Sequence, residues 1–286
     1  MVNYHCQKLK SVLYLVATPL GSARDITLRA LDVLCSCDAL AAEDTRSMRK
    51  LLNIHNIPLK DRPIVSYNDF NGDRVRPTIL NWLSSNMAVA YASDAGMPLI
   101  ADPGYQLSKQ AAEAGFYVTA VPGASACITA LSLSGLPTDR FFFEGFLPVS
   151  KEKRRQKLKE LSGISSTLIF YESPKRLIKM FEDLIDIMGE NRRAVIAREL
   201  TKKFEQIISG TLGELYALIL KKSLKGELVV LLDRPLTTGL DDLGVKAELR
   251  VALSEMTLKD ASDFVASAHG LSKRYVYNLA LSMREN

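Results

Sequence analysis

The sequence predicts an α/β protein, because short strand-like runs alternate with helical patterns along most of the chain. Apolar or β-branched runs such as VLYLVA and PIVSY are bounded by turn-forming residues, as strands usually are. Between them lie segments whose apolar residues recur every three or four positions, which is the period of one helix face. This alternation implies a mainly parallel sheet flanked by helices.

Five strands are predicted in the first half of the chain, at residues 12–17, 39–43, 63–67, 87–93 and 117–121. The helical patterns between them include ITLRALDVL, TRSMRKLL, VRPTILNWL and YQLSKQAAEAG. A helix between consecutive strands is the usual connection of parallel neighbours, so this half is expected to form one parallel sheet.

The pattern changes at the turn-rich stretch GLPTDR, residues 135–140, where we expect a domain boundary. Beyond it, FFFEGF, TLIFYE, RAVIARE, FEQIISG and ELVVLL are predicted strands, and FEQIISG follows RAVIARE closely enough to be its antiparallel neighbour. From residue 237 only helical patterns remain. We therefore expect an N-terminal α/β domain with the ligand loops (1–136), a mixed α/β domain (137–236) and a helical, helix-turn-helix-like tail (237–286).

Composition narrows the class of protein without choosing a function. The 286 residues are 47% hydrophobic and 24% charged, as in ordinary globular proteins, and the net charge of +5 permits a polyanionic partner without requiring one. The four cysteines form no CxxC pair and the three histidines lie far apart, so neither a disulfide framework nor a metal site is indicated. This cysteine pattern fits a reducing cytoplasm. No apolar run approaches the roughly 20 residues of a membrane span.

Three predicted strands are followed by loops of small residues, namely ATPLG (17–21), SDAGMPLIADPG (93–104) and PGASA (122–126). In a doubly wound sheet the carboxyl ends of the strands form the ligand-binding edge, so these loops are expected to gather there. Any one of them alone could be an ordinary tight turn. None is a GxGxxG or GxxxxGK[ST] motif, which argues against NAD, FAD and nucleoside triphosphates.

Seven ordered motifs resemble the ribosomal RNA small-subunit methyltransferase I family, a branch of the tetrapyrrole-methylase-like, class III methyltransferase fold. They are VATPLGSARDITLRALDVL, AEDTRSMRKLL, SDAGMPLIADPG, VPGASACITALSLSGLPTDRFFFEGFLP, FYESPKRL, RELTKKFEQIISG and KGELVVLL. The resemblance implies an S-adenosylmethionine-dependent enzyme that methylates the ribose 2'-oxygen of a cytidine in the decoding region of 16S ribosomal RNA. It further implies a homodimer, with the cofactor bound between the two domains.

The resemblance also assigns cofactor-binding residues to this sequence. They are Thr18, Pro19, Gly21, Ser93, Asp94, Ala95, Gly96, Ile100, Ser125, Ala126, Tyr171 and Gly226. In the Ser125–Ala126 turn, a helix N-terminus would offer free backbone N–H groups to the cofactor. The sequence departs from the family pattern at Ser22, Ala23, Met97, Ala101 and Ala124, which puts individual hydrogen bonds in doubt, and the segment SYNDFN carries no histidine that could act as a base.

Charged residues at strand ends are the candidates for catalysis, since a ribose hydroxyl must lose a proton as it is methylated. Asp44 and Arg46 are expected first, followed by Glu172, Glu199 and Lys202. Each could instead be a solvated charge or part of an ion pair, as for Glu199 with Lys202 at helical spacing. Asp44 could equally be the N-cap of the following helix.

Contacts to RNA are expected from the basic run SKEKRRQKLKE and from the tail. The candidates are Lys153, Arg154, Arg155, Lys157, Arg176, Lys273 and Arg274. A charge run is more often a solvated helix face, and the tail could serve packing or dimer formation instead. Two other functions stay open at this stage: a methylase of the same fold that acts on a small molecule or a protein, and a non-catalytic RNA-binding assembly protein.

Overall fold

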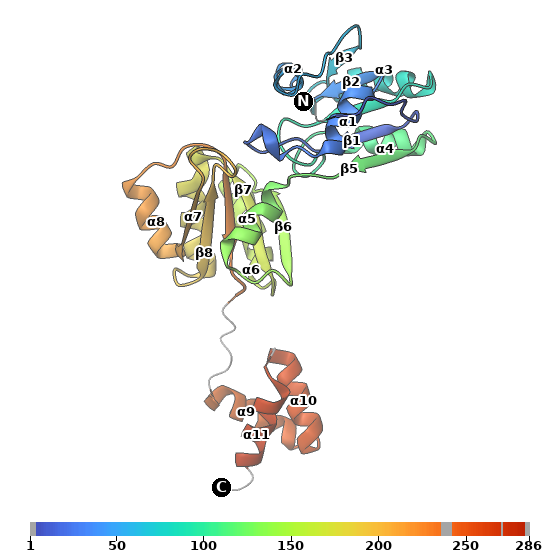
Figure 1. The fold of residues 1–286 in the computed structure, drawn as a ribbon. Coiled ribbons are helices and arrows are strands. Elements are labelled where there is room, and N and C mark those ends of the chain that lie inside the picture. Colours follow the sequence, from blue (N-terminus) through green and yellow to red (C-terminus); the bar gives the residue numbers. More distant parts are fainter. Residues whose placement is uncertain (1–3, 236–241, 270, 284–286) are drawn as a thin grey trace.

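Two five-stranded sheets follow one another along the chain, and Figure 1 shows the first in blue to green and the second in green to orange. The computed structural model describes residues 4–235, 242–269 and 271–283. All ten strands predicted from the sequence are observed, each with ends within two residues of the predicted run. The α/β fold class is confirmed.

The first sheet is fully parallel, with the strand order β3-β2-β4-β1-β5. Its strands are β1 (Leu13–Val16), β2 (Ala39–Ala42), β3 (Ile64–Ser66), β4 (Val89–Ala92) and β5 (Val118–Val121). The helices between them are α1 (Leu28–Ser36), α2 (Thr45–Ile54), α3 (Gly72–Ser84) and α4 (Tyr105–Glu113). Because the strands are parallel, the loops that follow β1, β2, β4 and β5 all lie at one edge of the sheet.

Helices cover both faces of the first sheet. On one face, the strands pack with Leu34 of α1 and Leu52 of α2. On the other face, they pack with Ile79 of α3 and Leu107 of α4. With both faces buried, a ligand can reach this domain only at the edge where the loops gather.

The second sheet is mixed, with the order β6-β7-β10-β8-β9. Its strands are β6 (Phe141–Phe146), β7 (Thr167–Glu172), β8 (Arg193–Arg198), β9 (Gln206–Thr211) and β10 (Leu228–Leu232). Only β6 and β7 are parallel, and β8 and β9 form the antiparallel pair that the sequence predicted. Helices α6 (Lys151–Ser162), α7 (Pro174–Met188) and α8 (Leu212–Lys221) pack on one face of this sheet.

Helix α5 (Ala126–Ser134) covers the other face of the second sheet, although it follows directly on β5 of the first. Its residues Cys127, Ala130 and Leu131 pack with strand residues of β7, β8 and β10. The helix thus lies before the joint expected at residues 135–140, yet it belongs by its packing to the second sheet. The exact domain boundary stays a prediction.

The C-terminal part contains α9 (Asp242–Leu253), α10 (Leu258–His269) and α11 (Lys273–Ser282). Their apolar residues, among them Leu249, Val265 and Val276, form a separate small core. The predicted tail therefore has a folded helical core, while Gly270, expected in its turn, lies outside the described residues. Across the residues that the structure describes, no helix is long and apolar enough to cross a membrane.

One disulfide joins Cys6 to Cys35, with 5.6 Å between the two Cα atoms. No sequence pattern predicts it, because the partners are 29 residues apart and no spacing rule connects them. It ties the N-terminal segment to the end of α1, where the backbone N–H of His5 also donates to Asp32. The sequence-based expectation therefore missed this contact between distant residues.

Candidate functional site

The loops after β1 and β4 are joined by a pair of backbone hydrogen bonds at the ligand edge. The Thr18 N–H donates to the Gly96 carbonyl at 2.9 Å, and the Gly96 N–H donates to the Thr18 carbonyl at 3.0 Å. Gly96 has a φ of +82°, and an added Cβ would lie 3.2 Å from the Leu20 side chain. A residue without a side chain is therefore needed where these loops cross.

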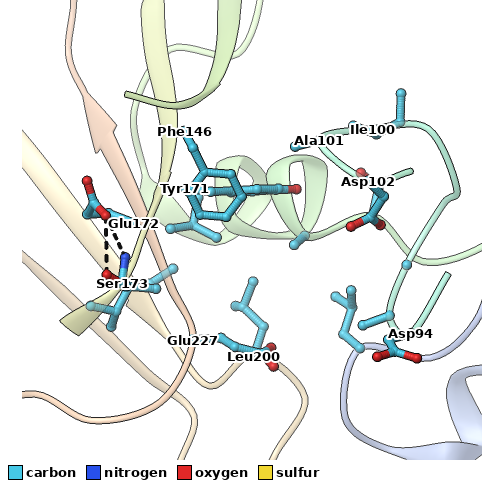
Figure 2. Close-up of a pocket in the computed structure, with 18 of the residues that line it drawn as sticks. Asp94, Ile100, Ala101, Asp102, Phe146, Tyr171, Glu172, Ser173, Leu200 and Glu227 are labelled. Atoms are coloured by element: carbon cyan, nitrogen blue, oxygen red, sulfur yellow. Dashed lines mark hydrogen bonds between the residues drawn. The ribbon is translucent and has the colours of Figure 1, made fainter. Parts of the chain in front are cut away.

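A cavity of about 420 Å³ opens between these loops and the second sheet. It is lined by Leu20, Glu43, Asp94, Ala95, Gly96, Met97, Ile100, Ala101, Asp102, Ser125, Ala126, Phe146, Tyr171, Glu172, Ser173, Pro174, Ala197, Leu200, Gly226, Glu227, Leu228 and Val229. Figure 2 shows Asp94 and Asp102 on one side, with Tyr171, Phe146 and Glu172 across from them. We call this space the main cavity.

Most of the residues assigned to the cofactor by resemblance come together in the main cavity. They are Asp94, Ala95, Gly96, Ile100, Ser125, Ala126, Tyr171 and Gly226. The remaining four, Thr18, Pro19, Gly21 and Ser93, line a neighbouring space described below. The two cavities share Leu20 and Asp94, so the assigned residues form one continuous region.

The loop from Met97 to Pro103 carries unusual backbone angles. Leu99 and Ala101 have φ values of +72° and +58°, a region that residues with a side chain rarely adopt. The Tyr91 hydroxyl holds the loop by donating to the Pro103 carbonyl at 2.7 Å. Backbone strain of this kind is often found at functional sites, and here it turns Asp102 toward the main cavity (Figure 2).

Carboxylates dominate the polar lining of the main cavity. The described residues that line it include Glu43, Asp94, Asp102, Glu172 and Glu227, and no lysine, arginine or histidine. Burial, reinforced by the nearby Glu43 carboxylate, raises the pKa of Asp102 to about 6. Burial also raises the pKa values of Glu43 and Asp94. This lining suits a cationic ligand, which would relieve the repulsion among the carboxylates.

Tyr171 forms part of the wall contributed by the second sheet. Its ring packs edge-on against Phe143 and Phe146, with centroids 5.0 and 5.7 Å away. Its hydroxyl accepts the Cys127 backbone N–H at 3.0 Å, which satisfies one of the free donors at the start of α5. The Cys127 N–H group is therefore used within the protein, while the expected contact of the Ser125–Ala126 turn with the cofactor stays a prediction.

Glu199 and Lys202 lie behind the turn that contains Gly226, and neither lines a cavity. Glu199 accepts the Glu227 backbone N–H at 2.9 Å and the Lys202 ammonium at 3.1 Å. A Cβ on Gly226, whose φ is +95°, would lie 2.3 Å from the Glu199 carboxylate. The pair therefore supports the turn, which corresponds to the ion-pair alternative recognised in the sequence.

Glu172 lines the main cavity but is almost fully buried. It accepts the Ser173 backbone N–H at 2.8 Å and lies 3.2 Å from the Arg176 guanidinium. Arg176 also donates to the carbonyls of Leu147 and Pro148. Arg176 is thus engaged by its own domain, which leaves it few donors for an RNA phosphate.

A second cavity of about 220 Å³ lies beside the main one, between the loop after β1, helix α2 and the end of β4. Asp44 lines it and caps α2, accepting the Arg46 backbone N–H at 2.8 Å. The Arg46 guanidinium also binds this carboxylate, at 2.8 Å from Oδ2. These hydrogen bonds lower the pKa of Asp44 to about 2, so it is charged at all physiological pH values.

The basic run of α6 divides into exposed and buried residues. Lys153 is exposed and Lys157 is half-buried, 3.0 Å from Glu160. Arg155 binds Asp183 at 3.1 Å and also pairs with Asp186. Arg154 is only 4% exposed, and its guanidinium binds Asp183 at 2.7 Å.

Arg154 must therefore be removed from the predicted RNA-binding group, because a phosphate cannot reach it. In the tail, Lys273 is exposed but lies 3.2 Å from Asp263, and Arg274 is exposed. Among the second-domain candidates, the side chain of Lys153 is exposed to solvent and those of Lys157 and Arg155 are partly exposed, so RNA can reach them.

Comparison with known proteins first defines the class of this protein. A family profile described as Tetrapyrrole (Corrin/Porphyrin) Methylases matches residues 12–216, and one described as RsmI C-terminal HTH domain matches residues 240–284. The fold is similar to that of the cobalt precorrin-4 methyltransferase CbiF, with a TM-score of 0.60 and 16% identity over 78% of this chain and 95% of that one. Diphthine synthase has the same TM-score and identity, over 77% and 89%. The protein has the tetrapyrrole methylase fold.

Closer relatives then define the family. The Ribosomal RNA small subunit methyltransferase I of Vibrio cholerae is 44% identical over 94% of both chains. The proteins of the same name from Escherichia coli O157:H7 and Bacillus subtilis are 42% and 37% identical, over 95% and 93% of both chains. The chain belongs to the ribosomal RNA small subunit methyltransferase I family, and it is a methyltransferase.

Sequence reasoning missed several residues of the main cavity, chiefly Asp102, Glu43, Phe146 and Leu200. Asp102 was within a quoted motif, and its place at the end of the loop after β4 was the available signal. Glu43 directly precedes Asp44 and was considered only as one charge among many. The others come from the second domain, whose position against the first could not be derived from strand order.

Arg154→Met should lower the free energy of unfolding by about 3–5 kcal/mol, because it leaves the buried Asp183 carboxylate without its main partner. Urea unfolding of the full chain would measure the loss. Lys153→Gln, next to it on the exposed face, is the matched control and should change stability little. Equal stability of both variants would contradict the structural assignment of Arg154.

Proposed function

We propose that this protein transfers a methyl group from S-adenosylmethionine to the ribosomal RNA of the small subunit. The acceptor that we propose is the ribose 2'-oxygen of a cytidine in the decoding region of 16S ribosomal RNA, as the family resemblance implies. The names of relatives that match 94% of the chain support the substrate class. We also propose a homodimer and a cytoplasmic location, where ribosomal subunits are found.

The carboxylate-rich main cavity is the observation that carries the choice of methyl donor. S-adenosylmethionine is cationic at its sulfonium and its amino group. Of the five carboxylates that line the cavity, Glu172 and Glu227 are paired with Arg176 and Lys202, whereas Glu43, Asp94 and Asp102 form no ion pair among the described residues. Apolar side chains such as Leu200 and Phe146 supply a wall for the adenine ring. Gly96 and Gly226, both with positive φ, allow the backbone to approach the ligand. The residues present therefore fit this donor.

The chemistry asks the protein to position two reactants and to accept one proton. When bound, S-adenosylmethionine supplies a methyl group on a positively charged sulfur. Holding the hydroxyl oxygen in line at about 3–3.5 Å from that carbon provides most of the acceleration. The oxygen gains the methyl group and loses its proton, so a nearby basic group assists the reaction.

Asp44 and Asp102 are the two candidates for the proton acceptor. Asp44 was expected first from the sequence, but its pKa of about 2, lowered by Arg46, makes it a weak base. Asp102, with a pKa of about 6, is better matched to proton transfer near neutral pH. We propose Asp102 as the acceptor and Asp44 with Arg46 as positioning residues, while Glu172, Glu199 and Lys202 keep the cavity wall in shape.

The function is tested by transfer of a labelled methyl group from S-adenosylmethionine to small subunits from cells that lack this protein. We expect label in 16S ribosomal RNA, at one ribose 2'-oxygen when the modified nucleotide is mapped. Subunits from cells that contain the protein are the control, since their site is already modified. Label that is absent from RNA, or present in protein, would contradict the proposal.

The affinity for S-adenosylmethionine should rise as the pH rises through about 6. Asp102 is neutral below its pKa and charged above it, so the cation is bound best by the deprotonated cavity. Calorimetry in buffers of different ionisation enthalpy should also detect proton release on binding at pH 6. S-adenosylhomocysteine, whose sulfur is neutral, should respond less, and a flat profile in both ligands would contradict the assignment.

Asp102→Asn should lower the single-turnover rate by about 10²- to 10⁴-fold, the usual effect of losing a general base. The decline in rate of the parent protein below pH 6 should disappear in this variant. Asp44→Asn keeps the N-cap of α2 and should stay within a few-fold of the parent. The opposite ranking of the two variants would assign the proton to Asp44.

A further inference from the structure

The second cavity is a separate space that shares a wall with the main cavity. Its volume of about 220 Å³ compares with about 420 Å³ for the main cavity. Leu20 and Asp94 line both spaces, and the Thr18–Gly96 hydrogen bonds join the loops between them. A ligand in the second cavity would therefore lie directly beside a ligand in the main one.

The walls of the second cavity have two chemical characters. Met48, Leu51 and Ile54 of α2 contribute apolar lining. The Ser47 hydroxyl of the same helix and the Asp44 carboxylate at its N-cap contribute polar lining. A nucleobase has flat faces that suit an apolar wall and a polar edge that needs hydrogen bonds, and carboxylates accept bonds from the amino group of cytosine.

The rim of this cavity is basic, in contrast to the acidic main cavity. Helix α2 contains Arg46, Arg49 and Lys50 and no acidic residue. All three side chains are exposed, and Lys50 lines the cavity itself. Arg46 is paired with Asp44, whereas Arg49 and Lys50 form no ion pair or side-chain hydrogen bond among the described residues. These two side chains are therefore available to an anionic ligand.

We propose that the second cavity receives a single nucleoside of the RNA, unstacked from its neighbours, and that Arg49 and Lys50 hold the adjoining phosphates. This inference rests on the proposed function and names the part of the site that takes the acceptor. It reassigns Thr18, Pro19, Gly21 and Ser93, which the resemblance gave to the cofactor, to the wall of the acceptor site. Enzymes that act on one nucleotide commonly extrude it into a pocket, and stacking against apolar side chains compensates for part of the lost base stacking. The shared wall at Asp94 then brings the ribose next to the methyl donor.

The charge part of the proposal is tested with Arg49→Gln/Lys50→Gln. Binding to small subunits from cells that lack the protein is measured by co-sedimentation over a series of salt concentrations. Two lost phosphate contacts should reduce the slope of log K against log[salt] by about 1.4, at roughly 0.7 per contact with single-stranded RNA. Lys221→Gln/Lys222→Gln, two adjacent exposed lysines at the end of α8, is the matched control and should keep the parental slope.

The cavity itself is tested with Ser47→Phe, which places a ring into it from the exposed first turn of α2. We expect about a tenfold loss of affinity for the subunit, with the calorimetric affinity for S-adenosylmethionine unchanged. Ser47→Ala removes the hydroxyl, which contacts Asp94, without adding bulk, so only the further change from Ser47→Ala to Ser47→Phe measures the filling of the cavity. Parental affinity and slope in both the Phe variant and the Arg49/Lys50 variant would overturn the proposal.

These outcomes are independent of the proposed reaction. If the parent protein transfers no methyl group to subunits but the binding changes are as expected, the second cavity is an RNA site and the proposed function fails. If the parent transfers the methyl group and neither variant affects binding, the reaction stands and the acceptor lies elsewhere. A loss of S-adenosylmethionine affinity in Ser47→Phe would assign the second cavity to the donor and overturn the proposal.

Discussion

Helix α5 determines the geometry of the site, because it belongs to the first sheet by its connection and to the second by its packing. Its start follows β5 at the ligand edge, while Cys127, Ala130 and Leu131 pack onto the second sheet. The Tyr171 hydroxyl, from β7, accepts the Cys127 N–H and fixes the start of the helix to the opposite wall. The main cavity therefore has walls from both sheets, and the start of α5, which follows β5 directly, connects them.

The carboxylates of the main cavity destabilise the folded protein when no ligand is bound. Burial and mutual repulsion raise the pKa values of Glu43, Asp94 and Asp102, which means that their charged forms are less stable here than in water. A carboxyl group with a raised pKa in the folded state destabilises the fold as the pH rises from its unfolded pKa through the folded one. The folded protein is therefore less stable near neutral pH than it would be without these carboxylates. The large cores on both sheets offset this destabilisation.

Local pattern was enough to predict the ten strands and the ligand edge, because strand runs, turn residues and sheet parallelism are all encoded over short distances. It was not enough for Arg154. In a helix as rich in charge as α6, the run KEKRR does not reveal that one arginine faces inward toward Asp183, 29 residues later. The Cys6–Cys35 disulfide and the packing of α5 could not be predicted from local pattern for the same reason, since each depends on contacts between residues far apart in sequence. Asp102 was overlooked because its position in the main cavity depends on an unusual loop conformation, with φ of +72° at Leu99 and +58° at Ala101.

The main cavity and the neighbouring helix α2 carry opposite charges. The main cavity offers carboxylates to a cation, whereas helix α2 presents Arg46, Arg49 and Lys50 beside the second cavity. The mild net charge of +5 does not reveal this arrangement, because it sums charges without regard to their position. Under the proposed roles of the two cavities, an anionic RNA strand would be repelled from the acidic cavity and attracted to the basic residues of α2, so each group of side chains would also exclude the other ligand. At Asp94, where the two spaces meet, the proposed arrangement would bring the uncharged hydroxyl of the acceptor next to the methyl donor.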